Sequence, residues 1–576
     1  MKRCPECRRD YYDETLLYCL DDGSALLEGP ATTDEPATAI LSEPGDVATG
    51  VVDTEGPTRT IGPSDTAQRG PSPSKTSEKT AVELAAGRKK LIAGSLGILL
   101  VVLLGFGGYW LYGERAAKPI DSIAVLPFVN KSGNPDSEYL SDGLAESLIY
   151  RLSQLPDLKV SPPSTVMQYK GRDIDPIKVG KELGVSAVVS GRIVQRDGNL
   201  TISADLIDIR QNKILWGEQY DRKMSDLLAT QREIAREIVS NLKLKVSGNE
   251  RSLAKHYTDN NEAYQLYLKA RFHWNKRAVE GNRKAIEYLN QAIEKDPGFA
   301  LAYAGLADAY SVPSSQMAPD DAMPMAKAAA TRALELDDTL AEAHTSMGRV
   351  LAAYDWNWAR ADQEFKRAIE LNPRYALAHS WYGSYLAAVG RLDASVAEKK
   401  LALELDPLSP IAVFDLGQSL FWSRDYKGAI EQFQKAIELD PDLPPAYLYT
   451  LLALGQMGRY EDAIELFQKM PLKQGNEWGS SVAAVAHIYA ITGRKQEART
   501  LLAQIQDAEK SQYIPAPSIA YVYSGLGERD QAFAWMEKGF KQRAFHLQWL
   551  KVDPRWDELR SDPRFADLER RVGLPQ

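Results

Sequence analysis

Cysteine is nearly absent from this 576-residue sequence. Its three cysteines all lie within the first twenty residues, so a disulfide-stabilised scaffold is excluded. An excess of basic residues is also missing, because 69 Lys and Arg stand against 78 Asp and Glu, for a formal net charge of -9. Nucleic acid is therefore not the expected partner.

The motifs of common enzyme classes are missing as well. The sequence has no GxxxxGKS/T phosphate loop, no HRD or DFG kinase motif, no GxSxG and no HExxH. All six histidines follow residue 247, so the segment before it cannot build a Ser/His/Asp or Cys/His site. We therefore expect a protein that is not an enzyme and has no catalytic residues.

The cysteines themselves form a short pattern in residues 1–27. Cys4-Pro5-Glu6-Cys7 is followed after eleven residues by Cys19, and Asp22 stands where a fourth cysteine would complete the second pair. This spacing resembles a zinc ribbon, in which paired thiolates hold a tetrahedral ion. We expect one structural zinc, bound by Cys4, Cys7, Cys19 and Asp22. The alternatives are a metal-free knuckle and a segment with reduced thiols.

A polar segment and an uncharged one come next. Residues 28–87 are rich in Pro, Thr, Ser, Gly and Asp, which predicts a disordered linker. Residues 88–113 predict a transmembrane helix, because 91–113 carry no charge and exceed the length needed to cross a bilayer; a buried core helix is the alternative. Arg88, Lys89 and Lys90 precede the span, so the amino terminus is expected in the cytoplasm and the later domains outside the inner membrane.

Residues 120–247 carry both strand and helix patterns. SIAVLPF is an apolar run of strand length, and leucines then recur at spacings of four and three, as on one helix face. These are Leu140, Leu144, Leu148, Leu152 and Leu155. Ala187–Arg196 and Asn199–Ile209 flank an Asp197–Gly198 turn, which predicts a hairpin, and KILWGEQY supplies a further strand. The sequence predicts a mixed α/β domain.

Residues 262–543 repeat a pattern in which Ala is followed four positions later by a large residue, and three positions after that by a second Ala. Its middle positions are 289, 330, 365, 399, 433, 467, 502 and 536. Most steps are 34 or 35 residues, the period of tetratricopeptide (TPR) repeats, and one step of 41 is assigned to SVPSSQMAPDDAMP between two helices. We expect about eight repeats in an all-α solenoid, followed by a capping segment over 544–576.

The α/β segment also resembles a known domain. SIAVLPF, YLSDGLAESLIYRLSQL, VSAVVSGRIVQRDGNLTISADLID and ILWGEQYDR are similar to the TolB amino-terminal-like (FlgO-like) domain. The resemblance implies a membrane-anchored bacterial protein of a kind that includes regulators and some adenylate cyclases. The terminal LKVDPRWDELRSDPRFADLERRVGL is similar to the closing segment of the same arrays.

The match to the TPR motif also places residues on the concave face of the solenoid. Repeats four and five put seven residues of the predicted partner-binding set there: Leu377, Ser380, Ser384, Ile411, Phe414, Gln418 and Phe421. The Lys/Asn/Arg clamp of chaperone-binding TPR domains is absent. We expect Phe414 and Phe421, two helical turns apart, to be exposed anchors for an apolar or mixed peptide.

These patterns predict a multidomain chain with a zinc-ribbon-like tip, one transmembrane helix, a mixed α/β domain and a TPR solenoid. The expected function is that of a membrane-anchored scaffold for protein partners. The alternative is a transmembrane signalling regulator whose cytoplasmic tip contacts a nucleic acid or a regulatory protein.

Overall fold

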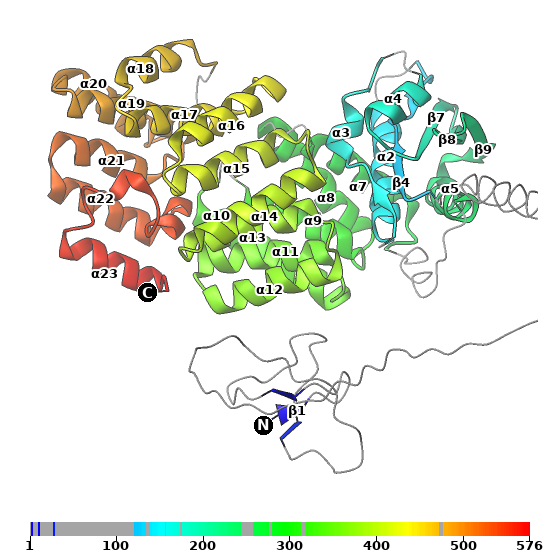
Figure 1. Cartoon of the computed structure of the whole chain (residues 1–576), viewed down its shortest axis with the longest axis horizontal. Coiled ribbons are helices and arrows are strands. Elements are labelled where there is room, and N and C mark those ends of the chain that lie inside the picture. Colours follow the sequence, from blue (N-terminus) through cyan, green and yellow to red (C-terminus); the bar gives the residue numbers. More distant parts are fainter. Residues whose placement is uncertain are drawn as a thin grey trace, which may run out of the picture. The chain divides into compact units, whose positions relative to one another are not determined.

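The computed structural model describes most of the chain after residue 119 and three short strands before it (Figure 1). The described residues are 2–3, 10–11, 27–28, 120–133, 137–155, 157–172, 175–242, 257–275, 279–312, 317–471 and 476–575. The chain divides into two compact units, Met1–Gly108 and Tyr109–Gln576. In the first unit, β1 (Lys2–Arg3) pairs antiparallel with β2 (Asp10–Tyr11) on one side and β3 (Leu27–Glu28) on the other.

Three predictions fall outside the described residues. The expected zinc ligands are among them: Cys4, Cys7, Cys19 and Asp22. The linker over residues 29–87 and the predicted span over 88–113 are also outside the described part. Within the part that the structure describes, no helix is both long enough and apolar enough to cross a membrane.

The predicted mixed α/β domain is confirmed. Its strands are β4 (Ser122–Val125), β5 (Val129–Asn130), β6 (Lys159–Val160), β7 (Ala187–Arg196), β8 (Asn199–Asp208) and β9 (Lys213–Lys223). Its helices are α2 (Glu138–Ser153), α3 (Pro163–Met167), α4 (Pro176–Glu182), the 3-10 turn η2 (Met224–Asp226) and α5 (Leu227–Asn241). The strand order is β6-β4-β7-β8-β9, with β5 also paired to β7.

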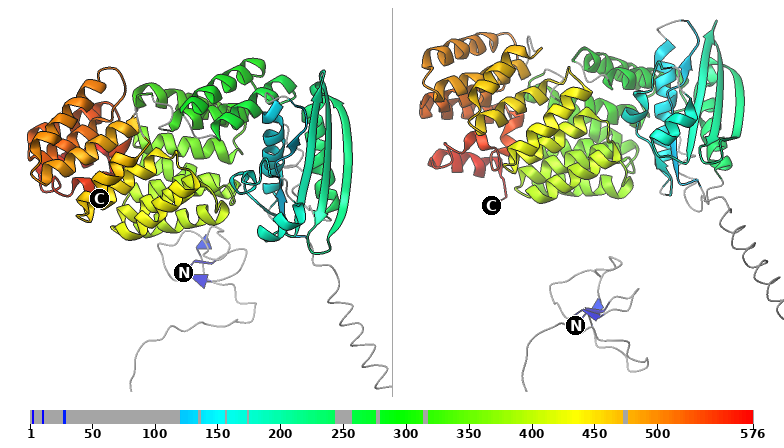
Figure 2. Two further views of the ribbon diagram at one scale, coloured as in Figure 1. Left: turned by 90° about the horizontal axis from the view of Figure 1, so that it is seen from above. Right: turned by 45° about the horizontal axis from the view of Figure 1, so that its top comes forward.

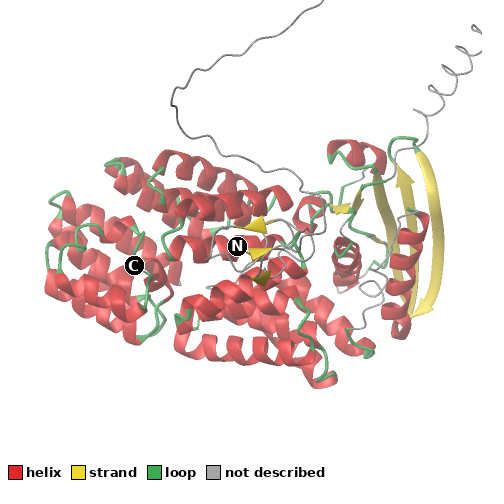
Figure 3. Ribbon diagram, turned by 60° about the horizontal axis from the view of Figure 1, so that its bottom comes forward, coloured by secondary structure: helices red, strands yellow, loops and turns green. Residues whose placement is uncertain are grey.

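The β7–β8 hairpin follows directly from its turn. Asp197 and Gly198 both have positive φ, 48° and 76°, which matches the twist of a two-residue hairpin. The alternating apolar residues of β8 are buried, so one sheet face lies against the core: Leu200, Ile202, Ala204 and Leu206. Figures 2 and 3 show the sheet at one end of the unit, with α2 between it and the helical repeats.

The remaining chain forms the predicted repeats. Its eight helix pairs are α7 (Asn261–Trp274) and α8 (Val279–Lys295), α9 (Ala300–Ser311) and α10 (Pro319–Leu336), α11 (Ala341–Val350) and α12 (Trp358–Leu371), α13 (Ala376–Ala388) and α14 (Leu392–Leu405), α15 (Pro410–Trp422) and α16 (Tyr426–Leu439), α17 (Pro444–Gln456) and α18 (Tyr460–Lys469), α19 (Asn476–Ile491) and α20 (Lys495–Ala508), α21 (Ala516–Leu526) and α22 (Arg529–Lys541). The repeated Ala and large positions are buried, as in Ala361, Phe365 and Ala368. Glycine lets the paired helices approach: a Cβ at Gly417 would lie 2.6 Å from Phe433.

The structure accommodates two departures from the 34-residue period, of 41 and 35 residues, in different ways. The insertion in the second repeat is only partly a connection, because α10 begins at Pro319 and carries Pro324 inside it. The extra residue between positions 330 and 365 widens one helical turn, so Leu351–Asp355 is a π-helix that ends at Trp356 in the left-handed conformation. A single inserted residue is thus absorbed without breaking the packing of α11 on α12.

The C-terminal cap consists of the 3-10 turns η5 (Phe545–Trp549) and η6 (Pro554–Trp556) and the helix α23 (Pro563–Val572). The side chain of Arg571 in α23 pairs with Glu537 of α22 at 2.6 Å. The indole Nε1 of Trp358 donates to the carbonyl O of Val572 at 3.1 Å. The end of the chain is therefore bonded both to the last repeat and to the third.

Candidate functional site: the inner face of the solenoid

The predicted partner-binding residues lie on α13 and α15, but they are not exposed. Leu377 and Ile411 are half-buried, and the other five are buried: Ser380, Ser384, Phe414, Gln418 and Phe421. The expectation of two exposed aromatic anchors is wrong, because Phe421 is 0% and Phe414 is 7% exposed. Both rings pack edge-on against Tyr449 of α17, with centroids 5.5 Å away. Their role in binding a partner stays a prediction.

A later part of the chain covers this face. We call residues 544–557 the inner segment; it connects α22 to the last loop before α23. Trp549 of this segment is 3% exposed, and its ring lies 4.7 Å from that of Trp422 at the end of α15. Its indole Nε1 donates to the backbone carbonyl of Ser384 at 3.2 Å. The concave face of repeats four and five is thus occupied by the chain itself.

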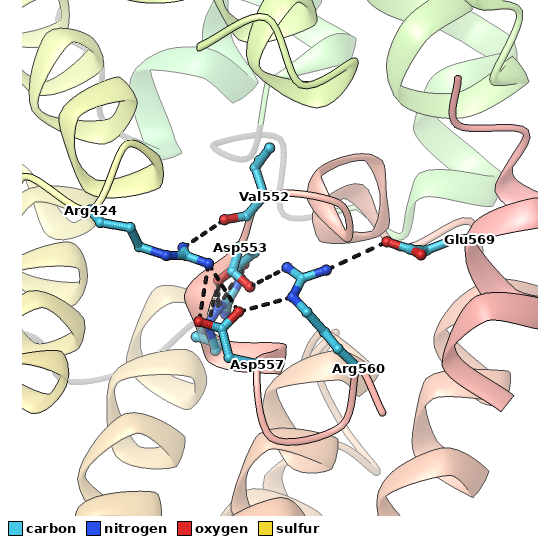
Figure 4. Close-up of polar contacts among 7 residues, drawn as sticks. Arg424, Val552, Asp553, Asp557, Arg560 and Glu569 are labelled. Atoms are coloured by element: carbon cyan, nitrogen blue, oxygen red, sulfur yellow. Dashed lines mark hydrogen bonds and ion pairs between the residues drawn. The ribbon is translucent and has the colours of Figure 1, made fainter. Parts of the chain in front are cut away.

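Arg424, in the turn after α15, holds the inner segment from one side (Figure 4). Its guanidinium donates to the carbonyl O of Val552 at 2.7 Å and to both carboxylate oxygens of Asp557 at 2.9 and 3.0 Å. From the opposite side, Arg560 donates to Asp557 at 2.9 Å and to the carbonyl O of Asp553 at 3.1 Å. Asp557 therefore lies between two guanidinium groups, one from a repeat and one from the cap.

A buried ion pair lies within the inner segment itself. Arg555 and Asp553 are 5% and 1% exposed, and their side chains are 2.6 Å apart. Burial alone lowers the pKa of Arg555, but Asp553 outweighs it and raises that pKa above its usual value. Because the two groups are only two residues apart, the pair closes a local turn within the inner segment.

Arg543, directly before the inner segment, and Phe545 near its start meet α11 and the π-helix that follows it. Arg543 lies 4.0 Å from the ring of Trp356 and donates to the carbonyl O of Tyr354 at 3.2 Å. Arg349 lies over the rings of Trp381 and Phe545, at 4.5 and 4.8 Å. Burial lowers the pKa of Arg349 to about 10, with Asp415 and Asp308 partly opposing this effect.

A buried lysine takes one of the large positions of the repeat. Lys399 is 0% exposed, and its Nζ donates to Ser384 at 2.7 Å and lies 3.3 Å from Asp415. Ser380 donates to the same carboxylate. Burial lowers the pKa of Lys399, with Asp415 opposing it. One of its polar partners, Ser384, also accepts the indole Nε1–H of Trp549 at its backbone carbonyl.

The α/β domain is joined to the first repeat by a second polar cluster. Glu146 of α2 accepts from Arg271 of α7 at 2.6 Å, and from Asn275 at 2.9 Å. One turn earlier on the same helix face, Asp142 pairs with Lys170 at 2.6 Å. Burial raises the pKa of Asp142, and Lys170 opposes it. Helix α2 therefore carries an acidic row that is matched by bases of both domains.

The remaining sequence candidates have local roles. His344 and His379, in first helices of adjacent repeats, each contact a glutamate of their own repeat at 2.7 Å, Glu364 and Glu398. Among the described residues, no group of three or more His, Cys, Asp or Glu side chains is arranged to hold a metal ion. The inner face is built of aromatic rings, guanidinium groups and backbone carbonyls, which contact the inner segment of the same chain.

Sequence reasoning missed the inner segment, although one signal for it was present. Glycine stands at positions 390 and 458, at the turn between the helices of two repeats, and Arg424 stands halfway between them. A non-glycine residue in this place indicates that its side chain has a use. Lys399 is a second such signal in the sequence, because it is a charged residue at a repeat position that is otherwise mostly large and apolar.

Two family models match parts of the chain. Residues 119–237 match the second domain of HilA/YgeH-like transcriptional regulators, which covers the α/β domain. Residues 410–443 match the tetratricopeptide repeat and coincide with the pair α15 and α16. The chain therefore contains TPR repeats, as the period predicted, next to a mixed α/β domain.

A curated relative and several solved structures are similar to parts of the chain. A putative adenylate cyclase 3 of Rhizobium meliloti (strain 1021) is 37% identical over 194 residues, 34% of this chain and 33% of the relative. The chain thus spans about a third of the length of that relative. PilF of Pseudomonas aeruginosa is 20% identical over 38% of this chain and 94% of its own, with a TM-score of 0.29. YrrB, a TPR protein with an unusual peptide-binding site, is 25% identical over 33% and 91%, with a TM-score of 0.22.

Proposed function

We propose that this protein is a non-enzymatic, membrane-anchored scaffold that binds protein partners through its TPR solenoid and α/β domain. In this proposal residues 88–113 cross the inner membrane, the amino-terminal tip binds zinc in the cytoplasm, and the described domains work outside it. The α/β domain and the solenoid act together, because Glu146 and Arg271 join them through a half-buried ion pair. Such a joint suits a platform that presents one continuous surface.

One observation supports protein binding more than any other. The inner face of the solenoid accommodates a segment without long helices or strands, residues 544–557, and contacts its backbone as well as its side chains. A groove whose side chains donate to backbone carbonyls, as Arg424 does to Val552, can bind a peptide of irregular conformation whatever its sequence at that position. The seven predicted partner-binding residues belong to the same face, and Leu377 and Ile411 remain partly accessible on it.

Site-specific photo-crosslinking in native membranes tests the proposal. A photoreactive residue at Leu377 or at Ile411 should label discrete partner proteins, because both sites border the inner face. Leu401, which is 37% exposed on α14, is the matched control site and should give no such adducts. Equal labelling from all three sites, or labelling from Leu401 alone, would contradict partner binding at the inner face.

A regulator is the second candidate function. It is favoured by the match of residues 119–237 to a domain of transcriptional regulators and by the similarity to a putative adenylate cyclase. In that case the cytoplasmic tip would bind a nucleic acid or a regulatory protein when the solenoid is occupied. Binding of DNA or of a cytoplasmic regulator to the tip of the full-length chain would support this function over that of a scaffold.

A further inference from the structure

The turn between the two helices of a repeat has a constant backbone conformation. Four repeats place a glycine with positive φ there: Gly390, Gly458, Gly493 and Gly527. Two repeats place another residue in the same left-handed conformation, Trp356 with a φ of 57° and Arg424 with a φ of 67°. Positions 356, 390, 424 and 458 are 34 residues apart, so all four are the same position of the repeat.

A left-handed conformation is unfavourable for any residue with a Cβ, and glycine avoids this penalty. Tryptophan and arginine are not the residues that tolerate it best. A strained backbone that persists in a structure points to a use for the side chain. The question is what these two side chains contact that the glycines cannot.

Both side chains contact the same region of the chain. Trp356 packs against Phe540, with ring centroids 5.2 Å apart, and under the guanidinium of Arg543 at 4.0 Å. Arg424 binds the carbonyl O of Val552 and the carboxylate of Asp557 (Figure 4). Arg424 therefore holds the carboxyl-terminal end of the inner segment, whereas Trp356 contacts the residues directly before its start.

The glycine turn between them has a different role. A Cβ at Gly390 would lie 3.2 Å from the side chain of Lys551. This turn passes close to the middle of the inner segment, where a larger residue has little room. Three consecutive turns thus lie along this part of the chain: Trp356 contacts the residues before the inner segment, Gly390 approaches its middle, and Arg424 binds its end.

We propose that the inner segment is a resident ligand of the solenoid, that the turn residue Arg424 is the latch that recognises it, and that Trp356 anchors the chain directly before it. The chemistry of this ligand defines the partner: a peptide with two aromatic residues four positions apart, like Phe545 and Trp549, followed by a carboxylate for Arg424. An outside peptide of this class competes with the inner segment for the same face. That last part rests on the proposed function, whereas the latch does not.

The substitution Arg424→Gly distinguishes a residue that holds the inner segment from one that is only strained, because the two cases predict different results. It restores the residue that the other turns carry, so the strain disappears together with the contacts. If the latch holds the segment, amide hydrogen exchange of residues 545–556 in the full-length chain should become about tenfold faster. If Arg424 were only a strained turn residue, exchange would be unchanged or slower, and that result would overturn the proposal.

Arg459→Ala is the matched control for this measurement. Arg459 directly follows the glycine turn of the next repeat and forms an exposed ion pair with Asp462 at 2.6 Å. The variant removes a surface arginine that also lies at a turn between two repeat helices but does not contact the inner segment. Exchange of residues 545–556 should not change, and an effect as large as that of Arg424→Gly would mean that the latch is not specific.

A synthetic peptide with the sequence of residues 543–560 tests the partner class directly. We expect it to bind the full-length chain carrying Trp549→Ala, in which the resident ligand is weakened, and to bind at least about tenfold more weakly when Arg424→Gly is added. A scrambled peptide should not bind. Equal binding with and without Arg424 would overturn the proposal. If Trp549→Ala prevents folding, the exchange measurement on Arg424→Gly decides alone, and neither result depends on a cellular partner.

Discussion

Trp549 and Ser384 are 165 residues apart in the sequence, yet the indole Nε1 of the first donates to the backbone carbonyl of the second at 3.2 Å. This bond places an aromatic residue of the C-terminal cap against the fourth repeat of the solenoid. Trp549 also packs on Trp422 at the end of α15, whereas Phe414 and Phe421 of the same helix are buried against Tyr449 of α17. The inner face, which the sequence predicts to be open for a peptide partner, is occupied by residues 544–557 of the same chain.

Replacing Phe421 by Ala should destabilise the protein strongly. The ring is 0% exposed and contacts Tyr449, so its loss should leave a cavity and cost about 3–5 kcal/mol of unfolding free energy. Leu377→Ala, at a half-buried site on the neighbouring α13, is the control and should cost about 1–2 kcal/mol because less surface is lost. Urea unfolding followed by circular dichroism measures both. Similar, small losses would mean that Phe421 is accessible after all.

Lys399→Met should also be destabilising, for an electrostatic reason. The change removes the cation that lies 3.3 Å from Asp415 and leaves a buried carboxylate without its counter-charge, at a cost of about 3–5 kcal/mol. The double variant Lys399→Met with Asp415→Asn should recover most of this loss, because no uncompensated charge remains. Thermal unfolding of the two variants tests the coupling. A double variant that is less stable than Lys399→Met alone would contradict it.

Acidification should destabilise the solenoid through its buried histidines. Burial lowers the pKa of His487 to about 4, and the ring is stacked on Tyr521 at 3.8 Å. The unfolded chain, with a histidine pKa near 6.5, then binds more protons than the folded one, so stability is complete above about pH 6.5 and falls as the pH drops toward 4. The loss from His487 should reach roughly 3 kcal/mol.

The variant His487→Gln isolates this effect. It should flatten the dependence of the unfolding free energy on pH between about pH 6.5 and 4, measured by urea unfolding at a series of pH values. His546, whose pKa burial lowers to about 3, would keep its own share of the acid sensitivity. An unchanged slope in His487→Gln would show that His487 does not titrate in this range.

Zinc analysis tests the prediction for the amino-terminal tip. We expect one zinc per full-length chain after anaerobic purification without chelators, because Cys4, Cys7 and Cys19 supply thiolates at ligand spacing. Replacing Cys4 and Cys7 by Ser should remove the metal, whereas Asp22→Asn should weaken its binding. Less than about 0.2 zinc per chain in the unchanged protein would rule out the site.

Protease accessibility tests the predicted topology. In spheroplasts, added protease should digest the repeats and spare the first 80 residues, because the cluster Arg88–Lys90 is expected to keep the amino terminus in the cytoplasm. Permeabilised cells are the control, in which both parts should be cut. Protection of the repeats with digestion of the amino-terminal tip would reverse every predicted compartment.

The helical repeats were predictable because their determinants are local and periodic. The positions of Ala361, Phe365 and Ala368 recur at fixed offsets along the array and carry small or large apolar residues in most repeats, and each repeat packs mainly on its neighbours. The β7–β8 hairpin was equally clear, because Asp197–Gly198 leaves few other turns open to the chain. For these elements, short-range patterns carry most of the information that the fold needs.

The inner segment could not be predicted in the same way. The contact of Arg424 with Val552 joins residues 128 positions apart, and no periodic pattern encodes it. A concave TPR face has the same sequence pattern whether it is empty or filled. The pattern also does not reveal that Phe414 and Phe421 pack on Tyr449 of the next repeat and are therefore buried. Only the residue type at position 424, where other repeats carry glycine, indicated that this turn does more than connect two helices.

Hydrogen exchange of the unchanged, full-length protein tests the central claim most directly. If residues 545–556 fill the inner face of the solenoid, their amides should exchange as slowly as those of α13 and α15, because Leu547, Leu550 and Trp556 are buried there with 0% exposure. Exchange of these amides within seconds, at the rate of an unstructured peptide, while α13 and α15 stay protected, would show that the inner face is empty in solution and would contradict the account.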